Sequence, residues 1–361
     1  MAKNNINNFL FLPLGGAGEI GMNLNLYGFG TPSNEAWLII DLGITFNSDT
    51  HAGIDVVMPN ISFIEERKKN LLALIVTHAH EDHLGAIPYL WPRLNCPIYA
   101  SPFAASILRA KFSEVGLEKR VDIRTNKFNQ QFQISQFELK FITLTHSIPE
   151  PNAIIIKTSE GTVVHTGDWK FDPNPVTGKS VDHQELSNIG ESGVLALVCD
   201  STNVFKNGVS GSEYDLQVEL AKTIGECSNR VVVACFSSNV ARLESIAHAA
   251  QVNGRKIVSA GRSIKRIEIA ARENGYLNSV PLFINERDVK EIPKNDLLVI
   301  CTGSQGESNA ALSKIADQTH PNIQLSAGDT VIFSSRIIPG NEISINTLYN
   351  KLEKQNIRVI T

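Results

Sequence analysis

The distribution of apolar residues changes its period along the chain. In the first 200 residues, short apolar runs are bounded by turns and contain many β-branched residues, which is typical of strands. Residues 71–76 form such a run, and residues 22–27 alternate between polar and apolar positions with the period of two that a strand requires. Ser101 and Pro102 begin an expected helix that continues to about Val115.

From about residue 212 onward, apolar runs alternate with stretches of helical period. We expect helices near residues 214–227, 240–252, 263–274, 310–317 and 344–354, and strands at residues 231–235, 256–260, 297–301, 330–333 and 358–360. This alternation predicts a parallel sheet with crossover helices. A chain of 361 residues is long enough for two domains of roughly 150 residues each. We place them at residues 1–205 and 206–361.

Three histidines and two carboxylates lie within residues 78–83, directly after the expected strand at residues 71–76. His78 and His80 are two residues apart, so in extended backbone their imidazoles project to the same side. Asp82 and His83 follow where the chain can turn into a helix, and they can face a different centre. Because imidazole nitrogens and carboxylate oxygens are ligands of Zn²⁺, the cluster predicts a metal site. The alternative is a chance grouping of structural histidines.

Two later strands deliver similar side chains into loops. The run at residues 141–144 leads to His146, and the run at residues 162–165 leads to Asp168. A single histidine such as His146 is more often structural than a ligand. Because His and Asp follow strand ends three times in one pattern, we expect these side chains to converge on a shared rim.

Two further acids follow strands. Asp41 ends the expected strand at residues 37–40, and we expect it to accept a hydrogen bond from a ligating histidine. The alternative is that Asp41 caps a turn before Gly43. Asp200 ends another apolar run in the same way.

A glycine-rich stretch near the N-terminus matches the pattern GxGxxG. It contains Gly16, Gly18 and Gly21, and Asp41 lies 20 residues further on, which is the spacing of a dinucleotide-binding fingerprint. That fingerprint requires a helix after the glycines, whereas residues 22–27 predict a strand. We therefore expect a glycine turn between two antiparallel strands, with its backbone close to a site.

The second region contains loops suited to an anion. Ser237, Ser238 and Asn239 lead from a strand into a helix that carries Arg242, so hydroxyl groups, helix N–H groups and a guanidinium can meet one phosphate. Residues 261–263 and 302–307 repeat the layout. For each loop, ordinary helix capping is the alternative.

Composition limits the protein classes that remain. The formal net charge of −4 shows no overall basic character, so nucleic-acid affinity must come from a local surface. The five cysteines are scattered and never form CxxC, which predicts free thiols in a reducing compartment and hence the cytoplasm. No apolar stretch approaches the ~18 residues of a membrane span.

Six segments together resemble the ribonuclease J family, which belongs to the β-CASP group of the metallo-β-lactamase superfamily. These segments are residues 14–21, 78–83, 146–150, 165–170, 199–203 and 302–307. The resemblance implies an α/β fold: a metallo-β-lactamase αββα sandwich joined to a parallel-sheet β-CASP domain. It also implies a zinc-dependent ribonuclease with 5′→3′ exonuclease and endonuclease activity in RNA processing and decay.

The resemblance further implies the roles of individual residues. His78, His80 and His146 would hold one Zn²⁺, Asp82 and His83 a second, and Asp168 would bridge both. Asp82, His83 and Asp168 would surround the hydroxide that acts as nucleophile between the two metals. Mn²⁺ could replace Zn²⁺ in such a set.

Other implications concern supporting residues and partners. Asp200 would match the first acidic motif of the β-CASP domain, and with Asp41 it would support the ligands. Ser237, Ser238, Asn239 and Arg242 would form a pocket for the 5′-monophosphate end of RNA. The complete protein would form a homo-oligomer without membrane contact. A DNA nuclease, a small-molecule ester hydrolase of the same fold and an inactive RNA-binding fragment are the alternatives.

In that family a last zinc-binding histidine follows the β-CASP domain. This sequence has no histidine after His320, and His320 does not match the motif. We therefore expect the metal held by Asp82, His83 and Asp168 to lack one protein ligand, and the first domain to lack its closing strands. We expect the chain to be a fragment of a longer protein.

Overall fold

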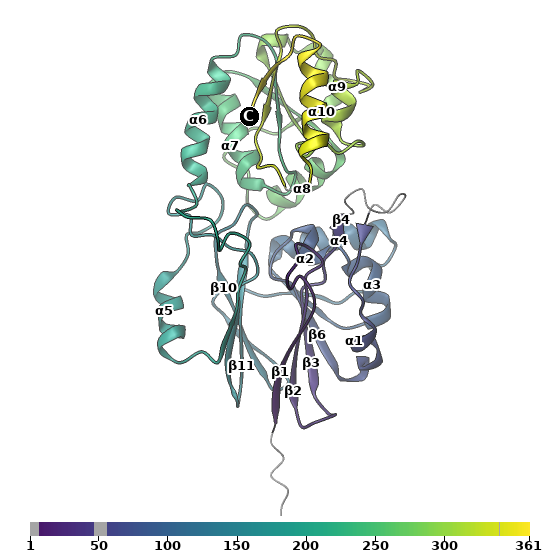
Figure 1. Cartoon of the computed structure of the whole chain (residues 1–361), viewed down its shortest axis with the longest axis vertical. Helices are drawn as coiled ribbons and strands as arrows, with labels where there is room; N and C mark the ends of the chain where they lie inside the picture. The colour runs from purple at the N-terminus through teal and green to yellow at the C-terminus, as the bar shows by residue number, and fades with distance from the viewer. Residues whose placement is uncertain (1–6, 47–55, 339) are drawn as a thin grey trace, which may run out of the picture. The chain divides into compact units, whose positions relative to one another are not determined.

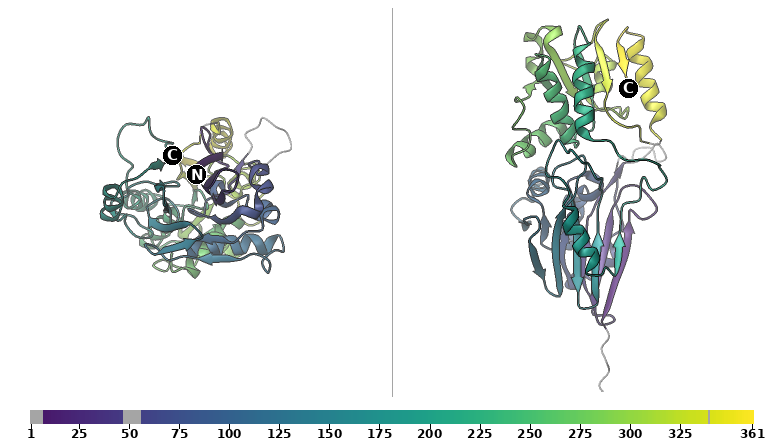
Figure 2. Two further views of the ribbon diagram at one scale, coloured as in Figure 1. Left: turned by 90° about the horizontal axis from the view of Figure 1, so that it is seen from below. Right: turned by 90° about the vertical axis from the view of Figure 1, so that its left-hand side faces the viewer.

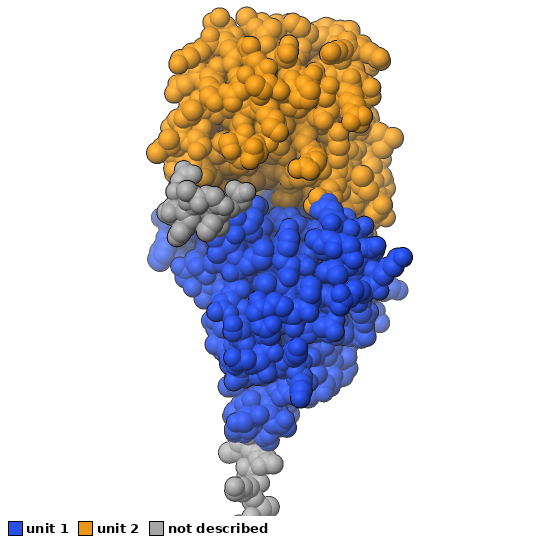
Figure 3. All heavy atoms as spheres, turned by 90° about the vertical axis from the view of Figure 1, so that its right-hand side faces the viewer, with its two compact units in different colours: residues 1–172, 179–210 blue, residues 173–178, 211–361 orange. Residues whose placement is uncertain are grey.

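The computed structural model describes residues 7–46, 56–338 and 340–361. It divides into two compact units (Figure 3). The first comprises residues 1–172 and 179–210, and the second comprises residues 173–178 and 211–361.

The first unit contains a six-stranded sheet in the order β1-β2-β3-β6-β7-β8. Its strands are β1 (Asn8–Gly15), β2 (Leu24–Gly30), β3 (Ala36–Ile40), β6 (Leu71–Ile75), β7 (Ile98–Ala100) and β8 (Ile123–Thr125). The first three pair antiparallel and the rest pair parallel. The glycine-rich stretch joins antiparallel β1 and β2, which confirms the predicted glycine turn and excludes the dinucleotide fingerprint.

A second sheet of the first unit has the order β13-β12-β11-β10-β9. Its strands are β9 (Gln131–Ile134), β10 (Phe137–Thr143), β11 (Asn152–Thr158), β12 (Gly161–His165) and β13 (Ala196–Val198). Only β13 pairs parallel to its neighbour. The short strands β4 (Thr45–Phe46) and β5 (Val56–Val57) form a separate hairpin.

Helices cover the outer faces of these two sheets. They are α1 (Ser62–Glu66), α3 (Ile87–Leu94), α4 (Pro102–Glu114) and α5 (His183–Glu191), with a 3₁₀ turn η1 (Lys68–Asn70). The short helix α2 (Glu81–Leu84) lies at the end of the first sheet's strands instead (Figure 1). The two sheets face each other, with α1 and α3 outside the first and α5 outside the second (Figure 1). The expected αββα sandwich is confirmed.

The core of the first unit lies between its two sheets. Phe137, Leu139 and Phe141 alternate along β10 and pack against Tyr27 and Phe29 of β2. Burying each of these side chains contributes roughly 1.5–3 kcal/mol. Because the sheets are fixed by this core, the loops at their strand ends are held at defined positions.

The second unit is built on a six-stranded parallel sheet in the order β16-β15-β17-β14-β18-β19. Its strands are β14 (Val231–Ala234), β15 (Lys256–Ala260), β16 (Ile284–Asn285), β17 (Leu297–Cys301), β18 (Thr330–Phe333) and β19 (Arg358–Ile360). The expected parallel sheet with crossover helices is confirmed, and β16 is an additional strand.

Its helices are α6 (Glu213–Gly225), α7 (Val240–Val252), α8 (Arg262–Glu273), α9 (Ala311–Ala316) and α10 (Glu342–Glu353), with the 3₁₀ turns η2 (Glu286–Glu291) and η3 (Lys294–Asp296). Within this unit, α6 and α7 lie on one side of the sheet and α9 and α10 on the other (Figures 1 and 2). No helix in the described parts of the chain is long and apolar enough to span a membrane.

The central strand β17 gives a direct test of this core. Ile300 is fully buried, whereas Ile343 on α10 is 81% exposed. We expect Ile300→Ala to lower the unfolding free energy of the second unit by about 2–5 kcal/mol, because it leaves a cavity. Ile343→Ala should change it by less than about 0.5 kcal/mol. Hydrogen exchange of this unit's amides in increasing urea measures both changes, and equal effects would contradict the described burial of Ile300.

Candidate metal centre

The predicted ligands meet at one rim of the first unit. His78 and His80 follow β6, and Asp82 and His83 lie on α2, which begins directly afterwards. His146 follows β10, and Asp168 follows β12. Within the described parts of the chain, two groups of side chains could each hold a metal ion: His78 with His80 and His146, and His78 with His83 and Asp168.

The three histidines of the first group lie close together, with His78 buried and His80 and His146 half-buried. His78 Nε2 lies 3.0 Å from His80 Nδ1, and the ring centroids of His80 and His146 are 4.9 Å apart. Burial lowers the pKa of His78 and of His80 well below the ordinary value, and it lowers the pKa of His146 as well. These imidazoles are therefore neutral and offer lone pairs, which is the form that binds a metal.

The second group centres on His83. Its Nε2 atom lies 3.2 Å from Asp168 Oδ1 and 3.5 Å from Asp82 Oδ2. Asp168 also approaches the first group, because its Oδ2 atom is 3.9 Å from His146 Nε2. One carboxylate thus faces both groups, as a bridging ligand would.

Charges in this region act strongly on one another. Burial by itself raises the pKa of Asp168, but the neighbouring His83, His146 and His80 outweigh it and lower that pKa. Burial lowers the pKa of His83, yet the surrounding carboxylates hold it well above the ordinary value. A divalent cation fits this set of imidazoles and clustered carboxylates, since it would compensate the carboxylate charge and take the place of the proton on His83.

Asp41 supports His83 from inside the fold. It is fully buried, and its Oδ2 atom lies 2.7 Å from His83 Nδ1. Thr77 donates to both carboxylate oxygens, from its backbone N–H and from its hydroxyl, each at 2.8 Å. This leaves Nε2 of His83 directed at Asp82 and Asp168. The geometry is that expected of an acid that orients a ligand.

Sequence reasoning missed Thr77, although it stands directly before the first histidine. Its hydroxyl lies 3.0 Å from His78 Nδ1 as well as bonding to Asp41. A buried threonine at a strand end carries no distinctive pattern, so only the three-dimensional contacts reveal it. The predicted helper Asp200 lies near the centre, since its charge acts to raise the pKa of His146. Its carboxylate also accepts a hydrogen bond from the Thr202 amide at 2.8 Å.

The predicted phosphate-binding residues lie in the second unit, where two of them have other partners. Asn239 caps α7, because its Oδ1 accepts a hydrogen bond from the Arg242 amide at 2.8 Å. The Arg242 guanidinium forms two hydrogen bonds with Glu213, at 2.7 and 3.2 Å, and a third with the Ser334 hydroxyl at 2.9 Å. These donors hold α6, α7 and the end of β18 together, and a role of Arg242 at a phosphate stays a prediction.

Ser237 and Ser238 differ from their neighbours. Both are half-buried, and no hydrogen bond of their hydroxyl groups is found among the described residues. The loop at residues 302–307, in contrast, is tied down by Gln305. The Gln305 amide nitrogen donates to the Arg336 carbonyl at 2.9 Å, and its oxygen accepts from the Ile338 amide at 2.9 Å. Compared with the loop at residues 302–307, the loop with the two serines keeps free hydroxyl groups.

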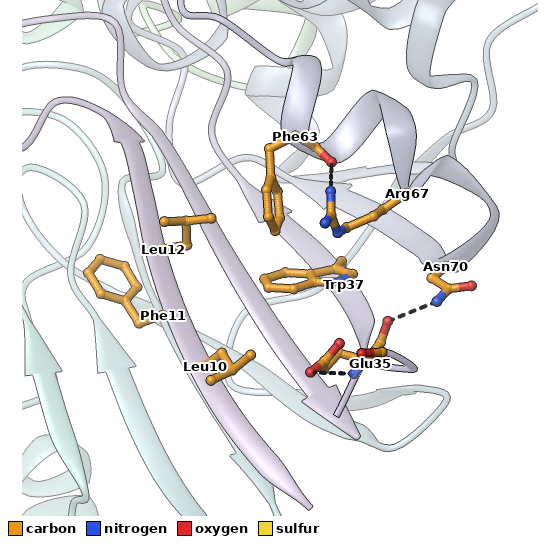
Figure 4. A pocket seen from close by; sticks show the side chains of 9 residues that line it. Leu10, Phe11, Leu12, Glu35, Trp37, Phe63, Arg67 and Asn70 are labelled. Carbon is orange, nitrogen blue, oxygen red and sulfur yellow. Dashed lines mark hydrogen bonds between the residues drawn. The ribbon is translucent and has the colours of Figure 1, made fainter. Parts of the chain in front are cut away.

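The first unit also has a separate groove of about 470 Å³ that shares no residue with the metal centre. Trp37 and Phe63 meet edge to face there, and Arg67 stacks on the Phe63 ring (Figure 4). No pattern in the sequence predicted this groove.

Comparison with known proteins places both units in a family. The αββα sandwich with His and Asp side chains at its rim defines a metallo-β-lactamase fold, and the family model of the metallo-β-lactamase superfamily matches residues 29–194. A second model, that of the ribonuclease J β-CASP domain, matches residues 228–352.

Relatives extend this match along the chain. Ribonuclease J of Sinorhizobium meliloti is 48% identical over 98% of the chain, and ribonuclease J 1 of Streptococcus pyogenes is 41% identical over 96%. The chain belongs to the ribonuclease J family. It spans 62% and 61% of the length of these two relatives. A protein of unknown function from Enterococcus faecalis, 16% identical, shares the fold with a TM-score of 0.64 over 98% of this chain and 87% of its own.

The role of Arg242 can be tested through stability. Arg242 and Glu213 are only 15% and 9% exposed, so Arg242→Ala removes the cation from a largely buried carboxylate. We expect it to lower the unfolding free energy of the second unit by about 3–5 kcal/mol. Arg336, an exposed arginine that follows β18, is the matched control and should cost less than about 0.5 kcal/mol as Ala. Unchanged stability of Arg242→Ala with weaker phosphate binding would restore its predicted role.

Proposed function

We propose that this chain carries the catalytic centre of a metal-dependent ribonuclease that hydrolyses RNA phosphodiesters. The observation that supports this most strongly is the meeting of all six predicted ligands at one rim, with Asp168 between the two groups. The names of the relatives, ribonuclease J, supply the substrate class.

Each residue has a proposed role. His78, His80 and His146 would hold one ion, and Asp82 and His83 the other. Asp168 would be shared by both, and Asp41 would fix the ring of His83 through Nδ1. We propose Zn²⁺, which suits imidazole and carboxylate ligands, although Mn²⁺ accepts the same donors.

Divalent metal in such a site lowers the pKa of water and stabilises the charge that develops on phosphate oxygens. The chain contributes preorganisation. The Asp41 carboxylate accepts a hydrogen bond from Nδ1 of His83, so Nε2 is the nitrogen directed at the metal site, where a bound ion would take the place of its proton. The low pKa of His78 and of His80 keeps both rings neutral at physiological pH.

The proposed substrate is RNA with a 5′-monophosphate end, cut both as a 5′→3′ exonuclease and as an endonuclease. The hydroxyl groups of Ser237 and Ser238, placed before the N-terminus of α7, support a phosphate site in the second unit. Arg242 and Asn239 complete the proposed phosphate site, and their contacts with Glu213 and the α7 backbone also hold the loop in shape.

Three further proposals complete the account. All five cysteines are free thiols, which supports a reducing compartment and hence the cytoplasm. We propose that residues 1–205 and 206–361 fold as separate domains, a division supported by the two compact units. The homo-oligomer of the complete protein remains a proposal.

Ligand substitutions test the proposed activity. In the complete protein that contains this chain, His80→Ala and Asp168→Ala should each abolish cleavage of 5′-monophosphorylated RNA, because each removes a metal ligand. Folding, monitored by circular dichroism, should be retained.

The matched control is His248→Ala, since His248 is exposed on α7 and should leave cleavage unchanged. Full RNA cleavage by either ligand variant would overturn the assigned centre. Cleavage of single-stranded DNA at the same rate as RNA would overturn the proposed substrate.

A further inference from the structure

Asn23, at the end of the glycine-rich turn, makes several contacts with the metal-centre loop. Its backbone N–H and its side-chain Nδ2 both donate to the Asp82 carbonyl oxygen, at 3.0 and 3.1 Å. Nδ2 also lies 3.2 Å from His83 Nε2. Its own carbonyl accepts a hydrogen bond from the Gly43 amide at 3.0 Å. A single residue thus connects the turn to both candidate ligands on α2.

These contacts complement those of Asp41. Asp41 holds the Nδ1 side of His83 at 2.7 Å, and the Asn23 amide lies beside the Nε2 side, which faces Asp168 at 3.2 Å. The orientation of the Asn23 amide follows from the Asp82 carbonyl, because a flipped amide would bring two oxygen acceptors together. A donor therefore borders the nitrogen that the metal would use.

The glycines around Asn23 provide the space for this arrangement. A Cβ atom on Gly16 would lie 2.3 Å from Asn23 Oδ1, too close for the side chain to keep its place. A Cβ atom on Gly43 would lie 1.6 Å from the Asp82 carbonyl oxygen that accepts both Asn23 bonds. Gly18 is different, because nothing lies within 4 Å of its position although its φ of +77° resembles the +81° of Gly16.

We propose that Asn23 is a positioning residue for the metal site formed by Asp82, His83 and Asp168, and that Gly16 is required because it leaves room for the Asn23 side chain. This inference rests on the proposed metal centre. It gives the GxGxxG-like turn a role that neither a nucleotide nor a hairpin alone explains. Because the Asn23 contacts described above all go to Asp82, His83 and Gly43, loss of Asn23 should act on that site and spare the one formed by His78, His80 and His146.

The first experiment is a metal titration of the full protein. Co²⁺ binding is followed by visible absorption, which reports the ligand geometry, and Zn²⁺ affinity is measured by competition. In Asn23→Ala, we expect one of two equivalents to bind about 10–100-fold more weakly, with an altered Co²⁺ spectrum, while the other is unchanged. Asn70→Ala is the matched control, since its amide also donates to a backbone carbonyl, that of Glu35, but away from the centre.

The second experiment compares two glycines of the same turn. Gly16→Ala and Gly18→Ala carry the same backbone strain, because both positions have a positive φ. Only Gly16→Ala crowds Asn23, so it should weaken the same equivalent as Asn23→Ala. Gly18→Ala should bind both ions as the unchanged protein does. This pair keeps the test decisive even where Asn23→Ala fails to fold.

The outcomes separate the two proposals. If the protein without substitutions binds no divalent metal, that result contradicts the proposed function itself. Suppose instead that the protein without substitutions binds one or two ions, and that neither Asn23→Ala nor Gly16→Ala alters any affinity or spectrum. That result overturns only the role of Asn23. Equal loss in Gly16→Ala and Gly18→Ala also overturns it, since backbone strain would then be the cause.

Discussion

The rim of the first unit depends on the hydrogen bonds of one buried carboxylate, that of Asp41. Taking a carboxylate out of water is costly unless it is hydrogen-bonded, and Asp41 is satisfied by Thr77 and His83. These partners come from the end of β6 and from α2, whereas Asp41 ends β3. A single buried acid thus joins three segments and fixes which nitrogen of His83 faces the rim.

Close packing near this acid explains why glycines stand at positions 16 and 43. The Asp82 carbonyl fits between the Asn23 amide and Gly43, where a side chain would collide with it. Close approach of backbone to backbone requires such positions to lack a Cβ. Glycines that resemble a phosphate-binding fingerprint therefore pack beside the candidate metal centre here, because their surroundings are two antiparallel strands and not a strand followed by a helix.

Much of the centre could be predicted from the sequence, because its chemistry is local. His78, His80, Asp82 and His83 lie within six residues, and strand periodicity places His146 and Asp168 at strand ends. The alternating second unit was also predictable, since each apolar run is bounded by capping and turn residues. The structure brings the six expected ligands together, while their role as ligands remains a prediction.

What escaped prediction depends on contacts between segments far apart in the sequence. Arg242 was assigned to phosphate because it follows a serine-rich loop, but Glu213, 29 residues earlier, forms an ion pair with it. Asn23 and Thr77 have ordinary neighbours in the sequence, and only the fold reveals that they meet His83. The helix α5 was missed because Leu186 and Ile189 alone form its apolar face, which packs half-buried against residues of β10, β11 and β12.

The central claim is that this rim holds divalent metal between the two groups of ligands. Diffraction from a crystal of the protein grown with Zn²⁺, recorded on both sides of the zinc absorption edge, tests it most directly. The account predicts anomalous peaks about 2.0–2.2 Å from imidazole nitrogens of His78, His80 and His146, and from the His83 and Asp82 ligand atoms, with Asp168 touching both. Absence of any peak at this rim, with the protein saturated in Zn²⁺, would contradict it.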